Sequence, residues 1–368
     1  MAVASRTAAE VEVERLEVSA YTVPTDEPES DGTLEWDATT LILVEVEAGG
    51  ETGLGYTYGA VAVGQFIESQ LADQVRGADP LRPQAAWAAM QQGIRNAGRP
   101  GVGAMAVSAV DVALWDLKAK LLGLCLADLL PRFHDTAPVY GSGGFTSYTG
   151  ERLREQLGTW VEMGIPRVKI KVGRNPDRDL HRLRVAREAI GAETALFVDA
   201  NGAFIPHEAL GWAGRYIDFE VSYLEEPVSS EDSRGMRLVR DRAPAGLAIA
   251  AGEYGWTLPE LAETADCVHV LQADVTRCGG VTNMLRVDGL CKARNIPFSA
   301  HCAPAISAHV CCGMECLAHL EYFHDHVRVE RLLFDGTLDP SGGALRPDRS
   351  RPGLGLELKR SDAEAYRA

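Results

Sequence analysis

Residues 196–201 read LFVDAN, residues 221–227 read VSYLEEP and residues 247–253 read LAIAAGE. Each hydrophobic segment leads into a carboxylate, and these carboxylates, Asp199, Glu225 and Glu253, are 26 and then 28 residues apart. That spacing is typical of one strand and one helix of a parallel α/β barrel. Because the carboxyl ends of barrel strands converge on one mouth, we expect the three side chains to meet there. The pattern therefore predicts a site for a hard divalent cation, with Mg²⁺ as the first candidate.

The same rhythm extends over most of the second half of the chain. Short β-rich segments, most of them separated by amphipathic segments, recur at 137–141, 167–172, 195–199, 221–225, 247–252, 268–272, 297–300 and 319–323. Eight strands with helical crossovers predict a barrel. An open doubly wound sheet is the alternative, but such sheets normally bind ligands at a glycine-rich phosphate turn. No GxGxxG or Walker-type loop follows an early strand here.

The residues on either side of the barrel follow different patterns. Residues 11–62 alternate as strands with a turn-prone EAGGETG, and residues from about 64 to 130 take a helical periodicity, which together predict an α+β domain. The glycine-rich end of the chain reads as loops and short strands that return to this domain. We therefore expect an N-terminal domain at 1–135, a barrel at 136–330 and a C-terminal segment at 331–368.

Composition excludes several classes of protein. A chain of 368 residues favours two domains, and a net charge of −16 argues against nonspecific nucleic-acid binding and against adhesion to an anionic membrane. No apolar h-region opens the chain, and no run of about 18 apolar residues predicts a membrane span. The eight cysteines form no CxxC motif, and Cys311, Cys312 and Cys316 lie in an apolar run. We expect a cytoplasmic protein in a reducing compartment.

Two lysines lie on the second predicted barrel strand. Lys169 and Lys171 are at positions i and i+2, so their side chains share one face of that strand. Inside a barrel two lysines are costly unless they serve a function, and crowding of like charges lowers an ammonium pKa until a free amine can act as a base. The alternative is that both lysines face the outer helices or solvent.

Further polar residues end the later strands. Asp199 and Asn201 repeat the i, i+2 spacing, whereas Glu225 and Glu226 are consecutive, so strand geometry would point only one of that pair into the mouth.

Asp274 and His301 end consecutive predicted strands and are 27 residues apart. A carboxylate beside an imidazole fixes its tautomer and raises its pKa, which makes it a competent acid or base. Glu321, in the eighth strand, is by itself more typical of a paired structural residue.

In order along the chain, these motifs resemble the enolase superfamily and, more narrowly, its mandelate racemase subgroup. The motifs are Lys169-x-Lys171, Asp199-x-Asn201, Glu225-Glu226-Pro227, Gly252-Glu253, Asp274 with Gly279-Gly280, His301 and Glu321. The resemblance covers nearly the whole chain. It implies an α/β fold, a modified TIM barrel of the (β/α)₇β type with an N-terminal α+β capping domain that the C-terminal segment completes.

The resemblance also implies roles for the residues that match. Asp199, Glu225 and Glu253 would bind Mg²⁺, which holds the carboxylate of a small-molecule substrate. Lys171 would remove the α-proton on one face, and Lys169 would lower the pKa of Lys171 and contact the carboxylate.

On the opposite face His301, oriented by Asp274, would act as the second acid or base. Glu321 would be protonated and donate to the developing ene-diolate, and Asn201 would contact the oxygen at the 2-position. Dehydration of a sugar acid is the reaction we expect. Racemisation or epimerisation of a 2-hydroxy acid, cycloisomerisation of a sugar acid and a noncatalytic binding barrel stay open. Relatives of this kind are commonly homo-oligomers.

Overall fold

An antiparallel sheet opens the part of the chain that the structure, a computed structural model, describes, residues 11–368. Its strands, β1 (Arg15–Ser30), β2 (Glu35–Ala48) and β3 (Glu51–Tyr58), pair in sequence order. Gly49 and Gly50 join β2 to β3 with φ of 59° and 83°, in the left-handed region that glycine adopts without strain. The strands expected for residues 11–62 are therefore confirmed.

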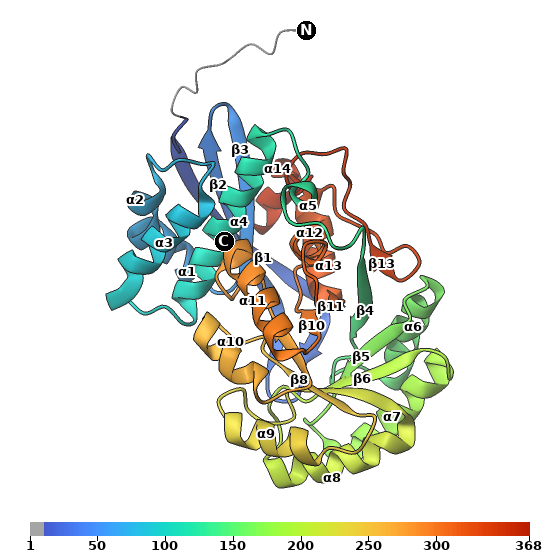
Figure 1. Ribbon diagram of the computed structural model, residues 1–368. Helices are drawn as coiled ribbons and strands as arrows, with labels where there is room; N and C mark the ends of the chain where they lie inside the picture. The colour runs from blue at the N-terminus through green and yellow to red at the C-terminus, as the bar shows by residue number, and fades with distance from the viewer. Residues whose placement is uncertain (1–10) are drawn as a thin grey trace.

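Helices cover one face of this sheet and form the cap with it. They are α1 (Ala62–Phe66), α2 (Ala72–Val75), α3 (Pro83–Gly93), α4 (Val102–Leu121) and α5 (Leu126–Leu129). The long helix α4 lies directly on β3, because a Cβ added to Gly53 or Gly55 would come within 2.2 Å of a carbonyl oxygen of α4. Figure 1 shows this cap, in blue to cyan, at one end of the molecule and the barrel at the other.

Eight parallel strands close into the predicted barrel. They are β4 (Ala137–Gly143), β5 (Arg167–Lys171), β6 (Ala195–Asp199), β7 (Val221–Glu225), β8 (Ala248–Ala251), β9 (Val270–Ala273), β10 (Phe298–Ala300) and β11 (Leu317–Phe323). Each pairs with the next along the chain, and β11 pairs with β4 to close the ring. The closure excludes the open doubly wound sheet and confirms the modified TIM barrel with its N-terminal cap.

Helices connect the barrel strands and form its outer layer. They are α6 (Gly150–Glu162), α7 (Pro176–Ile190), α8 (Pro206–Tyr216), α9 (Ser233–Arg242), α10 (Leu258–Ala265), α11 (Gly280–Arg294) and α12 (Pro304–Cys311). Inside the ring, Tyr140, Phe197 and Tyr223 pack with Ala250 and Val270. The barrel interior below the polar strand ends is therefore filled by side chains.

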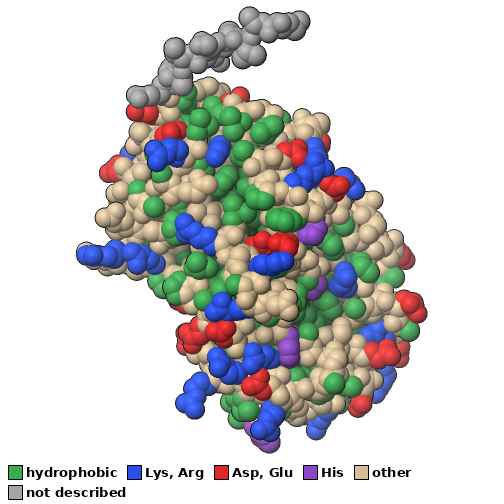
Figure 2. Space-filling view, in the orientation of Figure 1, with side chains coloured by type: hydrophobic (Ala, Val, Ile, Leu, Met, Phe, Trp, Pro, Cys, Tyr) green, Lys and Arg blue, Asp and Glu red, His purple; other side chains and the backbone are tan. Residues whose placement is uncertain are grey.

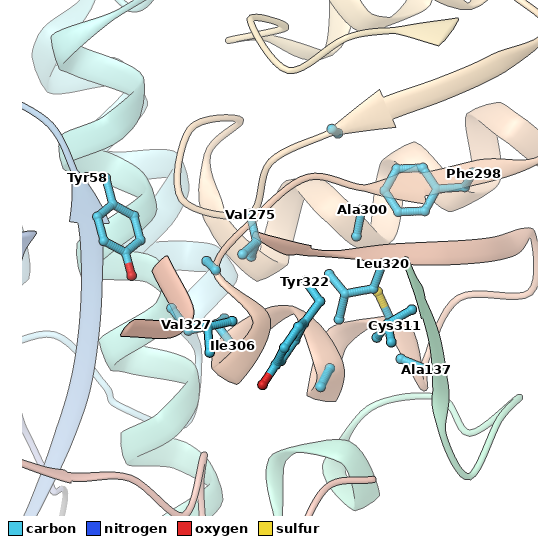
Figure 3. Packing of buried hydrophobic residues seen from close by; sticks show 14 of the residues in the cluster. Tyr58, Ala137, Val275, Phe298, Ala300, Ile306, Cys311, Leu320, Tyr322 and Val327 are labelled. Atoms are coloured by element: carbon cyan, nitrogen blue, oxygen red, sulfur yellow. The ribbon is translucent and has the colours of Figure 1, made fainter. Parts of the chain in front are cut away.

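One continuous apolar core joins the cap to the barrel. Tyr58 of β3 belongs to the same cluster of buried side chains as Val275, Ala300 and Leu320. Figure 3 shows Val275, Ala300 and Leu320 among the side chains of this cluster; Val275 follows β9, and Ala300 ends β10. The ends of β9 and β10 are therefore supported by closely packed apolar side chains.

The cap also holds the segment between β9 and α11 by hydrogen bonds. Ser108 of α4 accepts from the backbone N–H of Gly279 at 2.8 Å. Asp111, also on α4, accepts from the backbone N–H of Thr282 at 2.9 Å and from its hydroxyl at 2.7 Å. A Cβ on Gly280, whose φ is 78°, would lie 2.4 Å from a carboxylate oxygen of Asp111. The Gly279-Gly280 motif thus lets α4 approach the start of α11.

The C-terminal segment runs from the barrel to the cap. It contains α13 (His324–Leu333), β12 (Phe334–Asp335), β13 (Ala344–Leu345), β14 (Glu357–Leu358) and α14 (Arg360–Ala363). The backbone N–H of Ala368 donates to the carbonyl of Ala20 in β1 at 2.9 Å. The boundaries expected at residues 135 and 330 stay predictions.

Charged residues of both signs share the visible surface, and the cysteines are free. Figure 2 shows Lys and Arg side chains interspersed with Asp and Glu on the visible face. All eight cysteines are free thiols; Cys311 and Cys312 are buried, as expected, and Cys316 is only partly so. Among the helices of residues 11–368, none combines the length and apolar content that crossing a membrane requires.

Candidate active site

The predicted site residues lie together at the carboxyl ends of the barrel strands. The set is Lys169 and Lys171 on β5, Asp199 at the end of β6, Glu225 at the end of β7, Glu253 just after β8, Asp274 just after β9, His301 just after β10 and Glu321 on β11. All of these side chains are buried, and ion pairs or hydrogen bonds join them into one network.

Both lysines point into the barrel, which excludes the alternative that they face outward. Lys169 Nζ lies 2.7 Å from Glu225 Oε2 and 3.3 Å from Asp199 Oδ2, and Lys171 Nζ lies 2.6 Å from Asp199 Oδ2. Burial is the largest single effect and lowers the pKa of Lys171, but the carboxylates of Asp199, Glu253 and Glu321 together outweigh burial and the neighbouring Lys169 and raise that pKa. The lowering expected from lysine crowding is therefore overridden.

Asp199, Glu225 and Glu253 surround the centre of the mouth. Glu225 Oε2 contacts Lys169, whereas Glu225 Oε1 is buried without a hydrogen-bond partner. Burial, and next the Asp199 carboxylate, raise the pKa of Glu225 to about 8. Glu253 Oε2 lies 2.6 Å from His301 Nε2. The buried Glu225 Oε1 thus has no hydrogen-bond partner and is surrounded by other carboxyl groups. A bound cation would supply the missing partner.

Glu226 also faces this site, contrary to the expectation that only one of the two consecutive glutamates would. Strand β7 ends at Glu225, and Glu226 has a φ of 37°, so the alternation of a strand no longer applies. Its Oε1 is buried without a partner, and burial together with the nearby Glu253 raises its pKa well above the ordinary value. A residue forced into the left-handed region cannot be recognised from strand periodicity.

The network contains more carboxyl groups than permanent cations. Its buried carboxyl groups belong to Asp199, Glu225, Glu226, Glu253, Asp274 and Glu321, and its permanent cations are Lys169, Lys171 and the adjacent Arg277. Protonation of His301 adds one further charge. The raised pKa values of Glu225 and Glu226 keep protons on part of this carboxyl excess, and a hard divalent cation would replace those protons, with the oxygen ligands it prefers.

His301 and Asp274 form the predicted pair. His301 Nδ1 lies 2.8 Å from Asp274 Oδ2, while Asp274 Oδ1 accepts from the backbone N–H and the hydroxyl of Thr276, each at 2.7 Å. Burial lowers the pKa of His301, but the surrounding Cys302, Glu253 and other acidic groups raise it well above the ordinary value. The Asp274 contact leaves Nε2 facing the mouth.

Glu321 is held from one side by two donors. Ser142 Oγ donates to Glu321 Oε1 at 2.5 Å, and Lys169 Nζ lies 2.7 Å from the same oxygen. Burial raises the pKa of Glu321, but Lys169 and then His301 outweigh burial and hold it well below the ordinary value. These neighbours favour the ionised form of Glu321, and the protonated form that the resemblance implies stays a prediction.

Asn201 adjoins the network rather than joining its ion pairs. Its backbone N–H donates to Asp199 Oδ1 at 2.9 Å, and its side-chain Oδ1 is buried without a partner. Thr33, between β1 and β2 of the cap, donates its hydroxyl to the backbone carbonyl of Asn201 at 3.3 Å. This contact places a cap segment next to the mouth.

Sequence reasoning missed Cys302 and Arg277 as neighbours of the site. Cys302 Sγ lies 3.3 Å from His301 Nε2, and Arg277 Nε lies 3.6 Å from Asp274 Oδ2. The only available signal was their closeness in sequence to His301 and Asp274. Position alone does not tell which way such side chains turn after a strand has ended.

Comparison with known proteins agrees with this geometry. A family profile described as the mandelate racemase/muconate lactonizing enzyme N-terminal domain matches residues 17–131, and an enolase C-terminal domain-like profile matches residues 152–363. A curated relative, the 3,6-anhydro-alpha-L-galactonate cycloisomerase of Streptomyces coelicolor, is 30% identical over 95% of this chain and 98% of its own length.

Solved structures are similar over the whole fold. A mandelate racemase/muconate lactonizing enzyme-like protein from Rubrobacter xylanophilus is 70% identical with a TM-score of 0.96, covering 97% of this chain and 100% of its own. The L-talarate/galactarate dehydratase of Salmonella typhimurium LT2, solved with Mg and L-lyxarohydroxamate, is 28% identical with a TM-score of 0.88, covering 100% and 96%. The chain therefore belongs to the mandelate racemase/muconate lactonizing enzyme family of the enolase superfamily.

Proposed function

We propose that this protein is a Mg²⁺-dependent enzyme that removes the proton α to a carboxylate, and that it dehydrates an acid sugar to a 2-keto-3-deoxy acid. The observation that supports the proposal most strongly is that Lys171 and His301, two groups able to transfer protons, lie on different sides of a cluster of carboxyl groups. Lys171 stands on β5 and His301 follows β10, three strands away around the closed ring. A substrate between them meets one group on each face.

Asp199, Glu225 and Glu253 would hold the Mg²⁺. The unpartnered Glu225 Oε1 and the excess of buried carboxylates support this assignment. When bound, Mg²⁺ would offset the charge of the substrate carboxylate, to which loss of the α-proton adds a second negative charge. The Salmonella dehydratase was solved with Mg, which supports the same choice of metal.

The chain's own residues would carry the proton transfers. Binding of a cation to the Asp199 carboxylate would remove the main cause that raises the pKa of Lys171, so that Lys171, as the neutral amine, would accept the α-proton. The buried Lys169 ammonium would stabilise the ene-diolate as its charge develops. His301, protonated and held through Nδ1 by Asp274, would give its proton to the departing 3-hydroxyl, which leaves as water. The resulting enol would take up a proton at C3 and become the 2-keto acid.

Cycloisomerisation is the second candidate. The observation that favours it is the relative named 3,6-anhydro-alpha-L-galactonate cycloisomerase, which matches almost end to end. Both reactions begin with the same α-proton abstraction and differ in the bond broken or formed afterwards. The substrate is in either case a small carboxylate. Self-association and a cytoplasmic location, both expected from the sequence, stay predictions.

A panel of acid sugars and their lactones, incubated with the enzyme and Mg²⁺ in D₂O, tests the proposal. We expect one or a few substrates to exchange the α-proton and to give a 2-keto-3-deoxy product, both visible by NMR. A ring-opened or ring-closed isomer without keto product would support cycloisomerisation, and interconversion of stereoisomers alone would support racemisation. Absence of both exchange and product across the panel would overturn the proposal.

Mg²⁺ is expected to raise the Tm of the protein, because a ligand that binds only the folded state stabilises it by about 2.7 kcal/mol at a concentration one hundred times its Kd. Glu225→Gln should reduce this shift sharply, whereas Glu315→Gln, a change of a partly exposed glutamate on the barrel surface, should keep it. Differential scanning fluorimetry at matched ionic strength measures both. A full Mg²⁺ shift in Glu225→Gln would contradict the assigned metal site.

A further inference from the structure

Cys302 directly follows His301, yet both side chains point toward the carboxylate of Glu321. Strand β10 ends at Ala300, and Cys302 and Ala303 have φ of 51° and 43°, in the left-handed region that non-glycine residues rarely adopt. The turn brings Cys302 Sγ to 3.3 Å from His301 Nε2 and 3.3 Å from Glu321 Oε2. Ser307 Oγ donates to the carbonyl of Cys302 at 2.8 Å and holds the turn.

These three atoms form a triangle whose third edge, from His301 Nε2 to Glu321 Oε2, is 3.4 Å. Zinc binds sulfur at about 2.3 Å and nitrogen or oxygen at about 2.0–2.2 Å, so two tetrahedral ligands of one ion lie about 3.4–3.6 Å apart. The triangle therefore matches a tetrahedral face to within roughly 0.3 Å on each edge. Sulfur, imidazole and carboxylate are also ligand types that zinc accepts.

The residues behind the triangle already orient each ligand. Asp274 accepts from Nδ1 of His301 at 2.8 Å, which leaves Nε2 facing the triangle. Ser142 and Lys169 hold Glu321 through Oε1, which leaves Oε2 toward the triangle. A carboxylate behind a ligating histidine is the usual support of a zinc ligand.

We propose that His301, Cys302 and Glu321 form an inhibitory site for a thiophilic divalent cation, Zn²⁺ first. Its ligands are separate from the carboxylates assigned to Mg²⁺, and its thiolate discriminates against Mg²⁺. On binding, the thiol of Cys302 and Nε2 of His301 each lose a proton to solvent, and the sulfur and this nitrogen coordinate the ion. The fourth position is left to water.

The consequence of binding is that Nε2 of His301 is occupied. Under the proposed function this atom delivers a proton, so the bound cation blocks turnover even when Mg²⁺ is saturating. The inhibition rests on the proposed function, whereas the binding itself does not. The two claims are therefore tested separately.

Titration with Co²⁺ in the presence of excess Mg²⁺ tests binding, since Co²⁺ substitutes for Zn²⁺ and a thiolate–cobalt bond gives a charge-transfer absorption in the near ultraviolet. We expect about one equivalent of Co²⁺ to produce this band, and Zn²⁺ to displace it. Cys302→Ser and Cys302→Ala should lose the band. Cys316→Ser, a change of a partly exposed thiol away from the site, should retain it.

Circular dichroism checks that the Cys302 variants fold, and having two variants guards against the failure of one. A band that persists in both Cys302 variants, or that is absent from the wild type, overturns the proposal.

Inhibition is tested with an active substrate. Micromolar Zn²⁺ should inhibit the wild type, and the inhibitory concentration should rise at least tenfold in Cys302→Ala, relative to that variant's own activity. Equal inhibition of both proteins contradicts the site. If no substrate is turned over, the proposed function fails while the cobalt result still decides binding.

Discussion

Lys171→Ala is expected to lower kcat/KM for the acid-sugar substrate by about 10³-fold or more, because a positioned general base contributes about 10²–10⁴-fold to such a step. Exchange of the α-proton with D₂O should fall by a similar factor, since Lys171 is the group proposed to remove that proton. Lys292→Ala is the matched control, because Lys292 lies on the barrel surface with 62% of its side chain exposed. Wild-type exchange in Lys171→Ala would show that another group is the base.

His301→Asn separates the two proton transfers. It removes the group proposed to protonate the leaving hydroxyl but keeps a side chain able to hydrogen-bond to Asp274, which contacts His301 Nδ1 at 2.8 Å in the wild type. Dehydration should therefore fall as far as in Lys171→Ala, while exchange of the α-proton by Lys171 continues. NMR in D₂O follows exchange and product in the same sample. Equal loss of exchange in both variants would contradict the division of roles.

The second large effect is expected at Asp111, which has no part in the proposed proton transfers. Asp111→Ala should lower the free energy of unfolding by about 3 kcal/mol, because it leaves the buried N–H and hydroxyl of Thr282 without their acceptor. It also removes two of the hydrogen bonds between α4 of the cap and α11 of the barrel, whereas the indole N–H of Trp115 still donates to the Thr282 hydroxyl. Urea unfolding at pH 6 measures the change, and Asp241→Ala, on the exposed side of α9, is the control. A change below about 1 kcal/mol would show that the packing of α4 alone holds the cap.

The charge of Asp111 adds a dependence on pH. Burial raises the pKa of Asp111 to about 7 from a usual value of 3.8, so the folded state holds this proton more tightly than the unfolded state does. Its contribution to stability is therefore full below pH 4 and is lost as the pH rises from about 4 to about 7, by at most roughly 4 kcal/mol. Asp111→Asn keeps the shape without the charge. Its stability relative to the wild type should rise between pH 5 and pH 8, and a constant difference would contradict the raised pKa.

Periodicity explains why so much of the barrel was predictable. Each buried parallel strand must be short and apolar, and each crossover must be amphipathic, so the eight strands are visible as a repeat in the chain. The carboxyl ends of such strands meet at one mouth for geometric reasons. Asp199, Asp274 and His301 could therefore be placed together before any coordinates were known, and the ring closure between β4 and β11 confirms the arrangement.

Side chains just beyond the strand ends were not predictable in the same way. Glu226 and Cys302 turn toward the site because their backbones adopt left-handed φ of 37° and 51°, a choice that the surrounding packing imposes. The protonation of Lys171 and Glu321 likewise depends on neighbours brought from β6, β10 and β5, whose fields add only after folding. Local periodicity carries no information about either effect.

The sequence by itself determined the barrel, its cap and the identity of the groups at its mouth, because these follow from repeating patterns of apolar and polar residues. Only the tertiary structure decided which atoms of those groups touch. It paired Lys171 with Asp199, left Glu225 Oε1 unpartnered and placed the Cys302 thiol against His301. The physical reason is that hydrogen bonds and ion pairs act over a few ångströms, between residues that the chain separates by tens of positions.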